Sequence, residues 1–364
     1  MNDTFSKKIT RRNVLKNTVR ICFRAGMISL FLDGFHTRAF GDPAVQKSNQ
    51  TESGFEPAYL TLHRTGELKQ RADTLRAVME ECRLCPRECG VNRLAGERGF
   101  CRTPGAKLVV SAFSPHFGEE RPLVGKGGSG TIFLTHCNLR CVFCQNWEIS
   151  HLGRGNSSSV DELAGMMLTL QKIGCHNINL VTPTHYSGAI VRALDIAAAK
   201  GLRLPVVYNT SGYERLEILK LLDGIVDIYL PDFKYWDMAM AAKYSAGAER
   251  YPELARAAVR EMHRQAGVAK PDSNGIIQRG LMIRHLVMPN NTSGSEKVMG
   301  WIVENLPKDT YVNIMAQYRP VYKAYDYPEI SRRISREEYD KVVNRAVEIG
   351  LINLDVKKYG WPFG

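Results

Sequence analysis

Apolar and polar positions downstream of about residue 130 alternate between short apolar runs and longer amphipathic segments. Such runs are typical of buried strands, and apolar residues recurring every three to four positions are typical of helices. This alternation predicts parallel βα units. The predicted strands are 131–135, 178–181, 205–208, 226–230, 281–287 and 311–314, and the predicted helices are 161–173, 188–200, 214–222, 238–266, 295–305 and 335–349.

Six βα units are too few for a closed eightfold barrel. We therefore expect an α/β fold with an open, partial (β/α)6 TIM-like barrel and an N-terminal Cys-rich metal-binding segment. The chemistry should lie at the C-terminal ends of the strands. The predicted parts are a basic tail at 1–45, a helix plus Cys-rich segment at 56–110, and the barrel at 111–364. An amphipathic helix is predicted over 67–81.

The net charge of the chain adds little to the prediction of its function. The 364 residues carry a formal net charge of +12, and residues 1–45 supply +5 of it. The rest is scattered, with no basic stripe interleaved with aromatic residues, so we expect no nucleic-acid partner. Seven of the nine cysteines fall into two tight groups whose spacing suits metal better than disulfides.

The first cysteine group follows the strand at 131–135 with the spacing C-x3-C-x2-C, at Cys137, Cys141 and Cys144. Three thiolates leave one iron of a [4Fe-4S] cluster open to bind a substrate, whereas electron-transfer clusters usually have four protein ligands. A zinc knuckle is the alternative. His136 is poorly placed to be its fourth ligand on so tight a loop.

This loop resembles the signature of the radical S-adenosylmethionine (SAM) enzymes, including the aromatic Phe143 before the last cysteine. The resemblance covers roughly residues 110–350 and implies the same barrel architecture. It also implies that the open iron chelates the amino and carboxylate groups of SAM. One electron would then cleave SAM to methionine and a 5′-deoxyadenosyl radical.

The second group contains four cysteines, Cys82, Cys85, Cys89 and Cys101. Four ligands predict a closed site, either a structural zinc or an auxiliary [4Fe-4S] cluster, with disulfides as the alternative. The string from Cys82 to Arg93 resembles the N-terminal region of a radical SAM branch described as homologues of the pyruvate formate-lyase activating enzyme.

Polar residues follow the predicted strands where a barrel places its ligands. We expect them to hold SAM, with a cation on its carboxylate and hydroxyls or amides on its sugar. The candidates are Thr182, Thr184, His185, Asn209, Ser211, Asp232, Lys234 and Arg284.

The match to the activating enzyme differs between loops. That enzyme carries a Gly-Gly-Glu run after its second strand, where this chain has no carboxylate between Thr182 and His185. In the third loop Asn209 replaces an acidic residue, so a metal ion supported by that carboxylate is not expected. The Asp-x-Lys run and the arginine before the Val-Met-Pro segment match well, which favours Asp232, Lys234 and Arg284.

Localisation depends on the tail. The segment from Thr10 to Lys16 resembles a twin-arginine export motif, with Ala39 as a candidate cleavage point, but Arg20 and Arg24 interrupt the apolar stretch behind it. A basic cytoplasmic extension is the alternative. SAM and low-potential electrons are cytoplasmic supplies.

The sequence thus predicts a radical SAM enzyme of oxidoreductase type, similar to the pyruvate formate-lyase activating enzyme. A flavodoxin or ferredoxin would supply the electron, and the radical would abstract hydrogen from an unidentified substrate. The resemblance suggests a glycyl residue of a partner protein as that substrate. The alternative is a non-catalytic iron-sulfur electron-transfer protein that uses both cysteine groups.

Overall fold

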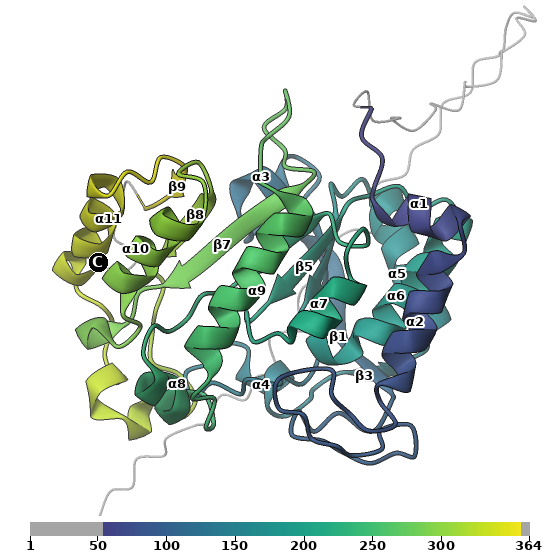
Figure 1. Cartoon of the computed structure of the whole chain (residues 1–364), viewed down its shortest axis with the longest axis horizontal. Helices are drawn as coiled ribbons and strands as arrows, with labels where there is room; N and C mark the ends of the chain where they lie inside the picture. The colour runs from purple at the N-terminus through teal and green to yellow at the C-terminus, as the bar shows by residue number, and fades with distance from the viewer. Residues whose placement is uncertain (1–53, 358–364) are drawn as a thin grey trace, which may run out of the picture. The chain divides into compact units, whose positions relative to one another are not determined.

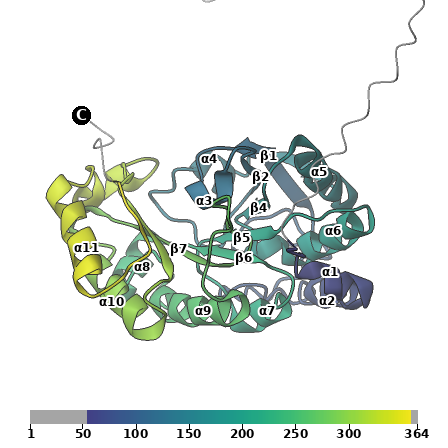
Figure 2. The same cartoon turned by 90° about the horizontal axis from the view of Figure 1, so that it is seen from above.

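A single curved sheet organises the fold, and helices cover its outer face (Figures 1 and 2). The computed structural model describes residues 54–357. The nine strands lie in the order β3-β1-β2-β4-β5-β6-β7-β8-β9. Their bounds are β1 Leu108–His116, β2 Ser129–Leu134, β3 Asn156–Ser158, β4 Ile178–Val181, β5 Val206–Thr210, β6 Ile228–Pro231, β7 Gly280–Leu286, β8 Tyr311–Met315 and β9 Leu354–Asp355.

The sheet has a parallel centre. Strands β2, β4, β5, β6, β7 and β8 pair in parallel with their neighbours, and these are the six strands that the sequence predicts. On one side β1 pairs antiparallel with both β2 and β3, and on the other side β9 pairs with β8. The strands β3 and β9 form the two edges, so the barrel is open, as expected for a partial (β/α)6 barrel.

Helices follow most strands of the parallel set. Their bounds are α1 Tyr59–Arg64, α2 Glu67–Ala77, α3 Arg121–Val124, α4 Trp147–Ser150, α5 Val160–Ile173, α6 Ser187–Ala199, α7 Leu216–Leu221, α8 Met238–Tyr244, α9 Tyr251–Ala266, α10 Ser295–Asn305 and α11 Arg336–Glu348. Two of them begin with a capping box, Ser159 with Glu162 for α5 and Ser335 with Glu338 for α11. Each box satisfies backbone N–H groups that the first helical turn leaves free.

Two helix predictions need correction. The helix predicted over 67–81 ends at Ala77, and beyond it the N–H groups of Met79 and Glu80 donate to carbonyls only three residues back, as in a turn. The helical region predicted over 238–266 is divided into α8 and α9. Between them Ala246 and Gly247 have φ values of 50° and 74°. These positive values lie outside the right-handed α-helical region, so the chain cannot continue as one helix there.

The two faces of the parallel strands pack against different partners. The outer face contributes to a large core with the helices, for example through Tyr208 and Ile283. The inner face forms a smaller apolar cluster, closed by Leu123 of α3. This cluster consists of Leu123, Val207, Ile228, Leu230, Ala269, Ile277, Met282 and Tyr311.

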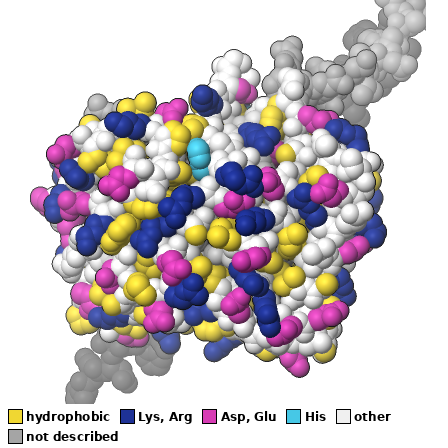
Figure 3. Space-filling model, in the orientation of Figure 1, with side chains coloured by type: hydrophobic (Ala, Val, Ile, Leu, Met, Phe, Trp, Pro, Cys, Tyr) yellow, Lys and Arg dark blue, Asp and Glu magenta, His cyan; other side chains and the backbone are white. Residues whose placement is uncertain are grey.

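Surface charge is mixed on the face shown in Figure 3, where Lys and Arg side chains are interspersed with Asp and Glu. Within residues 54–357, no helix combines the length and the apolar character needed to cross a bilayer. The twin-arginine motif and the basic tail lie outside the described residues, so the export prediction stays a prediction. The predicted division at residue 110 also stays a prediction.

Candidate active site

Three cysteines lie on the loop that leaves the C-terminal end of β2. Cys137, Cys141 and Cys144 are free thiols. The residue before each of the first two cysteines has a left-handed backbone, with φ of 65° at His136 and 56° at Arg140. The chain therefore turns sharply twice within a few residues, which keeps the three thiols on one short loop.

The loop is held against neighbouring segments by backbone and aromatic contacts. The Val142 N–H donates to the carbonyl of Tyr244, the last residue of α8, at 2.8 Å. The ring of Phe143 meets Tyr235 and Tyr318 edge to face, with centroids 6.3 and 5.8 Å away. The aromatic residue of the cysteine motif is therefore part of the core and fixes the base of the loop.

Polar groups surround the thiols. The Ser245 hydroxyl donates to Cys141 Sγ at 3.1 Å, and Ser150 Oγ lies 3.1 Å from Cys144 Sγ. Burial raises the pKa of Cys141 to about 12, and the nearby Lys234 ammonium opposes this rise. Because metal binding requires thiolates, these donors and this cation favour the form in which cysteine binds a metal.

Four of the predicted SAM-site residues converge at the ends of β5, β6 and β7. The Asp232 carboxylate accepts hydrogen bonds from Lys234 Nζ at 2.6 Å and from Arg284 Nε at 2.8 Å. Arg284 Nη2 donates to Asn209 Oδ1 at 2.6 Å. Burial alone would raise the pKa of Asp232, but Arg284 and Lys234 hold it below its ordinary value.

Two acidic residues that the sequence analysis did not select join this group from the loop between β1 and α3. Glu119 Oε2 lies 3.5 Å from Arg284 Nη1, and Glu120 Oε1 accepts a hydrogen bond from Asn313 Nδ2 at 2.9 Å. Burial raises the pKa of Glu119 to about 7, because it outweighs the attraction of Arg284. The ion cluster therefore has an acidic side facing β8.

The loop after β4 contains three of the predicted residues, and two of them have internal partners. The Thr184 hydroxyl donates to Glu214 Oε1 at 2.6 Å, and the Thr210 hydroxyl donates to the same oxygen. His185 Nε2 lies 2.9 Å from the Thr135 carbonyl oxygen, and burial lowers the pKa of His185 to about 3. Thr184 and His185 thus connect neighbouring loops, and Glu214, which the sequence analysis did not select, joins two of them.

The remaining candidates lie where the β4 and β5 loops meet. The Thr182 N–H donates to the Asn209 carbonyl at 2.9 Å. The Tyr251 hydroxyl lies 2.9 Å from the Ser211 carbonyl oxygen and 2.8 Å from that of Asp232. Within the described residues, Ser211 Oγ is buried without a hydrogen-bond partner.

Comparison with known proteins decides the family. A family model described as the radical SAM superfamily matches residues 131–266. An uncharacterized protein of Methanocaldococcus jannaschii, MJ0674, is 33% identical over 293 residues, which are 78% of this chain and 79% of that protein. The chain belongs to the radical SAM superfamily. Membership implies a [4Fe-4S] cluster, SAM and SAM-dependent radical chemistry.

Other relatives of this radical SAM chain are more distant. A second uncharacterized protein of Methanocaldococcus jannaschii, MJ0808, is 25% identical over 295 residues, which are 72% of this chain and 79% of that protein. A radical SAM methyltransferase from Sphaerobacter thermophilus has 16% identity and a TM-score of 0.45, covering 64% of this chain and 67% of its own. Methylornithine synthase (PylB) has 13% identity and a TM-score of 0.39, covering 81% and 74%.

The cysteine loop of this radical SAM chain fits a cluster in the number and chemistry of its donors. Burial raises the pKa of the Cys137, Cys141 and Cys144 thiols, and the positive charge of Lys234 opposes the rise in each. Within residues 54–357, no three or more Cys, His, Asp or Glu side chains lie close enough together to hold a metal ion. Since metal sites commonly close as the metal binds, the thiols supply the donors rather than a finished cage.

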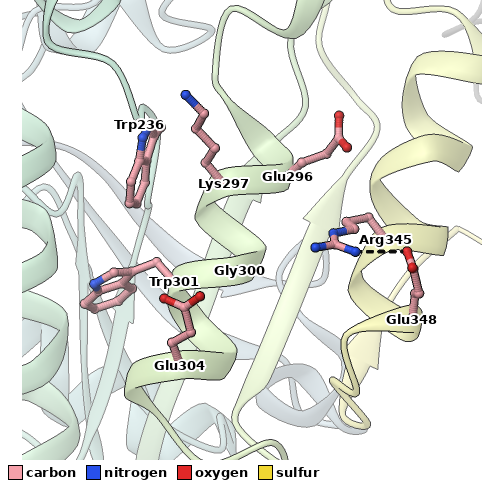
Figure 4. Close-up of a pocket in the computed structure, with 8 residues that line it drawn as sticks. All are labelled: Trp236, Glu296, Lys297, Gly300, Trp301, Glu304, Arg345 and Glu348. Carbon is pink, nitrogen blue, oxygen red and sulfur yellow. Dashed lines mark hydrogen bonds and ion pairs between the residues drawn. The ribbon is translucent and has the colours of Figure 1, made fainter.

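Away from these thiols, the radical SAM chain has a surface hollow of about 510 Å³. Figure 4 shows Trp236 and Trp301 on one side of it and the ion pair of Arg345 with Glu348 on α11 on the other. None of the predicted site residues lines the hollow, which lies on the helical side of the sheet. The candidate active site therefore remains the cysteine loop and the strand ends.

Proposed function

We propose that this chain cleaves SAM reductively at a [4Fe-4S] cluster held by Cys137, Cys141 and Cys144. The observation that supports this most strongly is the loop after β2, which carries three free thiols, with hydroxyls 3.1 Å from Cys141 Sγ and from Cys144 Sγ. Such a cluster supplies an open iron for SAM and one electron. Cleavage then yields methionine and a 5′-deoxyadenosyl radical, which takes a hydrogen atom from the substrate.

Lys234 is the residue that we assign to the SAM carboxylate. Its ammonium has one ion-pair partner in the described part of the chain, Asp232, and keeps further N–H donors. Arg284 is less suited, because its Nε, Nη2 and Nη1 atoms already face Asp232, Asn209 and Glu119. Arg284 would therefore orient Asp232, and Asp232 would orient Lys234.

The finer function is that of an activating enzyme. We assign the electron to a flavodoxin or ferredoxin and the abstracted hydrogen to a glycyl residue of a partner protein. The Asp-x-Lys run at Asp232 and Lys234, with Arg284 before the Val-Met-Pro segment, supports this oxidoreductase subtype by its resemblance to the pyruvate formate-lyase activating enzyme. The absence of a carboxylate between Thr182 and His185 leaves the SAM amino group to carbonyls and hydroxyls of that loop.

The test is anaerobic reconstitution with iron and sulfide, followed by addition of dithionite and SAM. We expect methionine and 5′-deoxyadenosine in equal amounts. The variant Cys141→Ala should lose both products. The variant Cys175→Ala is the matched control, because Cys175 is a buried free thiol outside both cysteine groups. Reconstituted wild-type protein that holds a cluster and forms neither product would contradict the proposal.

A non-catalytic electron carrier would behave differently in the same experiment. It would be reduced and reoxidised reversibly, and its cluster spectrum would not respond to SAM. A change in the electron paramagnetic resonance (EPR) spectrum of the reduced cluster on addition of SAM therefore favours the enzyme, because only an open iron binds the nucleoside.

A further inference from the structure

The four-cysteine segment has no regular secondary structure of its own. Between the end of α2 at Ala77 and the start of β1 at Leu108, the chain forms only turns and bends. The family match at residues 131–266 does not include it. Small segments that lack a core of their own are commonly held together by a metal or by disulfides. The cysteines here are free thiols.

Hydrogen bonds gather the four cysteines on one folded loop. Cys82, Cys85 and Cys101 are buried, and Cys89 is partly buried. The Gly90 N–H donates to the Cys82 carbonyl at 3.1 Å, which brings the residue after Cys89 to Cys82. The Phe100 N–H, next to Cys101, donates to Cys89 Sγ at 3.2 Å. Four thiols gathered on one loop are the donor set of a closed thiolate site.

A buried cation accompanies these thiols. The side chain of Arg93 is 1% exposed, and its Nη1 atom lies 4.0 Å from Cys82 Sγ. Arg93 donates to the carbonyls of Gly105 at 3.0 Å and His185 at 2.8 Å, but its Nη2 atom is buried without a partner. No carboxylate within residues 54–357 forms an ion pair with it. A buried guanidinium without a counter-charge is costly, so an anion is expected beside it.

We infer that Cys82, Cys85, Cys89 and Cys101 bind a metal centre as four thiolates, and that this centre holds Arg87 in place as a positioning residue for the SAM-cluster loop. The four thiols release their protons on binding. Four thiolates around Zn²⁺, or around a [4Fe-4S] core, leave a net negative charge, which is the counter-charge that Arg93 lacks. The positioning part of this inference rests on the proposed function of the three-cysteine loop.

Arg87 lies between two of the proposed ligands, Cys85 and Cys89, and reaches the other cysteine loop. Its Nε atom donates to the Asn138 carbonyl at 3.0 Å, and Nη2 donates to that of Leu139 at 3.4 Å. Both carbonyls lie between Cys137 and Cys141. A closed centre on either side of Arg87 fixes the origin of its side chain, and its hydrogen bonds then fix the backbone of the SAM-cluster loop.

Further contacts hold the same guanidinium from other sides. Its Nη2 and Nη1 atoms each donate at 2.9 Å to the carbonyls of Ser245 and Ala246, respectively. Its Cζ atom lies 3.8 Å from the ring centroid of Phe100, next to Cys101 in the four-cysteine segment. Ser245 is also the residue whose hydroxyl donates to Cys141, so Arg87 fixes a donor to the SAM-cluster thiols as well as their backbone.

Metal analysis of anaerobically reconstituted protein tests the site. The triple variant Cys137→Ala, Cys141→Ala, Cys144→Ala should retain either about one zinc or about four iron and four sulfide per chain. A triple variant that retains neither metal overturns the inference. Should that variant fail to fold, wild-type protein that cleaves SAM with about four iron and no zinc per chain overturns it equally, because the SAM cluster then accounts for all the metal. Cys175→Ala should match the wild type.

Two arginine variants test the positioning role. Arg87→Ala should keep the metal of the four-cysteine centre, but lose iron from the three-cysteine loop to a chelator about ten times faster than the wild type, as loss of an outer-shell partner predicts. The change in the EPR spectrum that SAM causes should also be smaller in Arg87→Ala than in the wild type. Arg83→Ala is the matched control, since Arg83 is an exposed neighbour that pairs with Glu81. Equal iron loss in the two variants overturns the role of Arg87.

The outcomes separate the two proposals. If wild-type protein forms no cluster at Cys137, Cys141 and Cys144, or does not cleave SAM, the proposed function fails, while the metal content of the triple variant still decides the four-cysteine centre. If wild-type protein cleaves SAM and the triple variant holds no metal, the proposed function stands and the centre does not.

Discussion

The guanidinium of Arg284 and the carboxylate of Asp232 are joined at the end of neighbouring strands, with Nε donating to Oδ1 at 2.8 Å and a backbone bridge between the same two residues. Lys234 Nζ donates a hydrogen bond to the other carboxylate oxygen, Oδ2, at 2.6 Å. Side chains of all three residues are 16% exposed. Asp232 is therefore the largely buried anion that both cations share, which makes it the centre of the cluster.

Removal of Asp232 should cost more stability than removal of a surface acid. Asp232→Ala leaves Arg284 and Lys234 without their shared anion, which predicts a loss of roughly 3–5 kcal/mol of unfolding free energy. The control is Asp73→Ala, whose partner Lys69 lies 2.9 Å away on the surface of α2. Removal of that exposed pair should change the stability little, because water screens it. Urea denaturation measures both, and equal losses would contradict the central role of Asp232.

Gly212 fills a position that no other residue can occupy without strain. Its φ is 76°, and an added Cβ would lie 2.4 Å from the Asp232 carbonyl oxygen. Gly247 has a φ of 74° with nothing within 4 Å of such a Cβ. Gly247→Ala should cost about 1–2 kcal/mol for the left-handed backbone alone. Gly212→Ala should cost about 1–3 kcal/mol more. Matching urea midpoints for the two variants would show that the contact is relieved freely.

Much of the barrel follows from local patterns. Each buried strand is an apolar run, and the polar residue that ends it points to the site because parallel strands share one C-terminal edge. Asn209, Asp232 and Arg284 are predictable for this reason, and the structure brings them within hydrogen-bonding distance. The first cysteine group is recognisable because its spacing encodes its chemistry within eight residues.

Other site residues leave no local signal. Glu119 lies 165 positions from Arg284 in the sequence. It follows β1, whose mixed burial gives no regular strand pattern, so no strand is predicted before it. Arg87 lies 51 positions from Asn138. Glu214 follows a predicted loop, but its role depends on Thr184, 30 positions away. Periodicity reports neighbours within a few turns, whereas these contacts depend on how separate loops meet in the folded chain. The available signal for Glu119 and Glu120 was two adjacent acidic residues just before Pro122.

Stability should fall between pH 5 and pH 8 in part through Glu214. Burial raises the pKa of Glu214 from an ordinary value of 4.5 to about 7, although the hydroxyls of Thr184 and Thr210 oppose the rise. The native protein then binds more protons than the unfolded chain between these two values, so the stabilisation is present below pH 4.5 and is lost as the pH rises to about 7. The loss is on the order of 3 kcal/mol at most.

The variant Glu214→Gln isolates this contribution, because Glu119 and Asp227, two other carboxyls whose pKa burial raises to about 7, remain in both proteins. The difference between urea midpoints at pH 5 and pH 8 should be smaller in the variant than in the wild type, since an amide does not titrate. Glu80→Gln, at an exposed position beyond the end of α2, should leave the wild-type difference unchanged. A variant with the full wild-type pH dependence would place the titration elsewhere.

Ser245 should set the reduction potential of the proposed cluster. Its hydroxyl donates to Cys141 Sγ at 3.1 Å and lies 2.9 Å from the Tyr235 hydroxyl oxygen, so the donor is held in place by a second buried group. Hydrogen bonds to ligand sulfur stabilise the reduced, more negative state of an iron-sulfur cluster, so Ser245→Ala should lower the potential by on the order of tens of millivolts. An EPR-monitored redox titration measures the shift. Ser331→Ala is the control, because the exposed Ser331 hydroxyl bonds only to the Pro328 carbonyl among the described residues.

A potential that is unchanged or higher in Ser245→Ala would mean that the Ser245 hydroxyl does not donate to the cluster ligand. A lowered potential with intact SAM cleavage under a strong reductant, and slower cleavage under a weak one, would connect this hydrogen bond to the rate of the reaction.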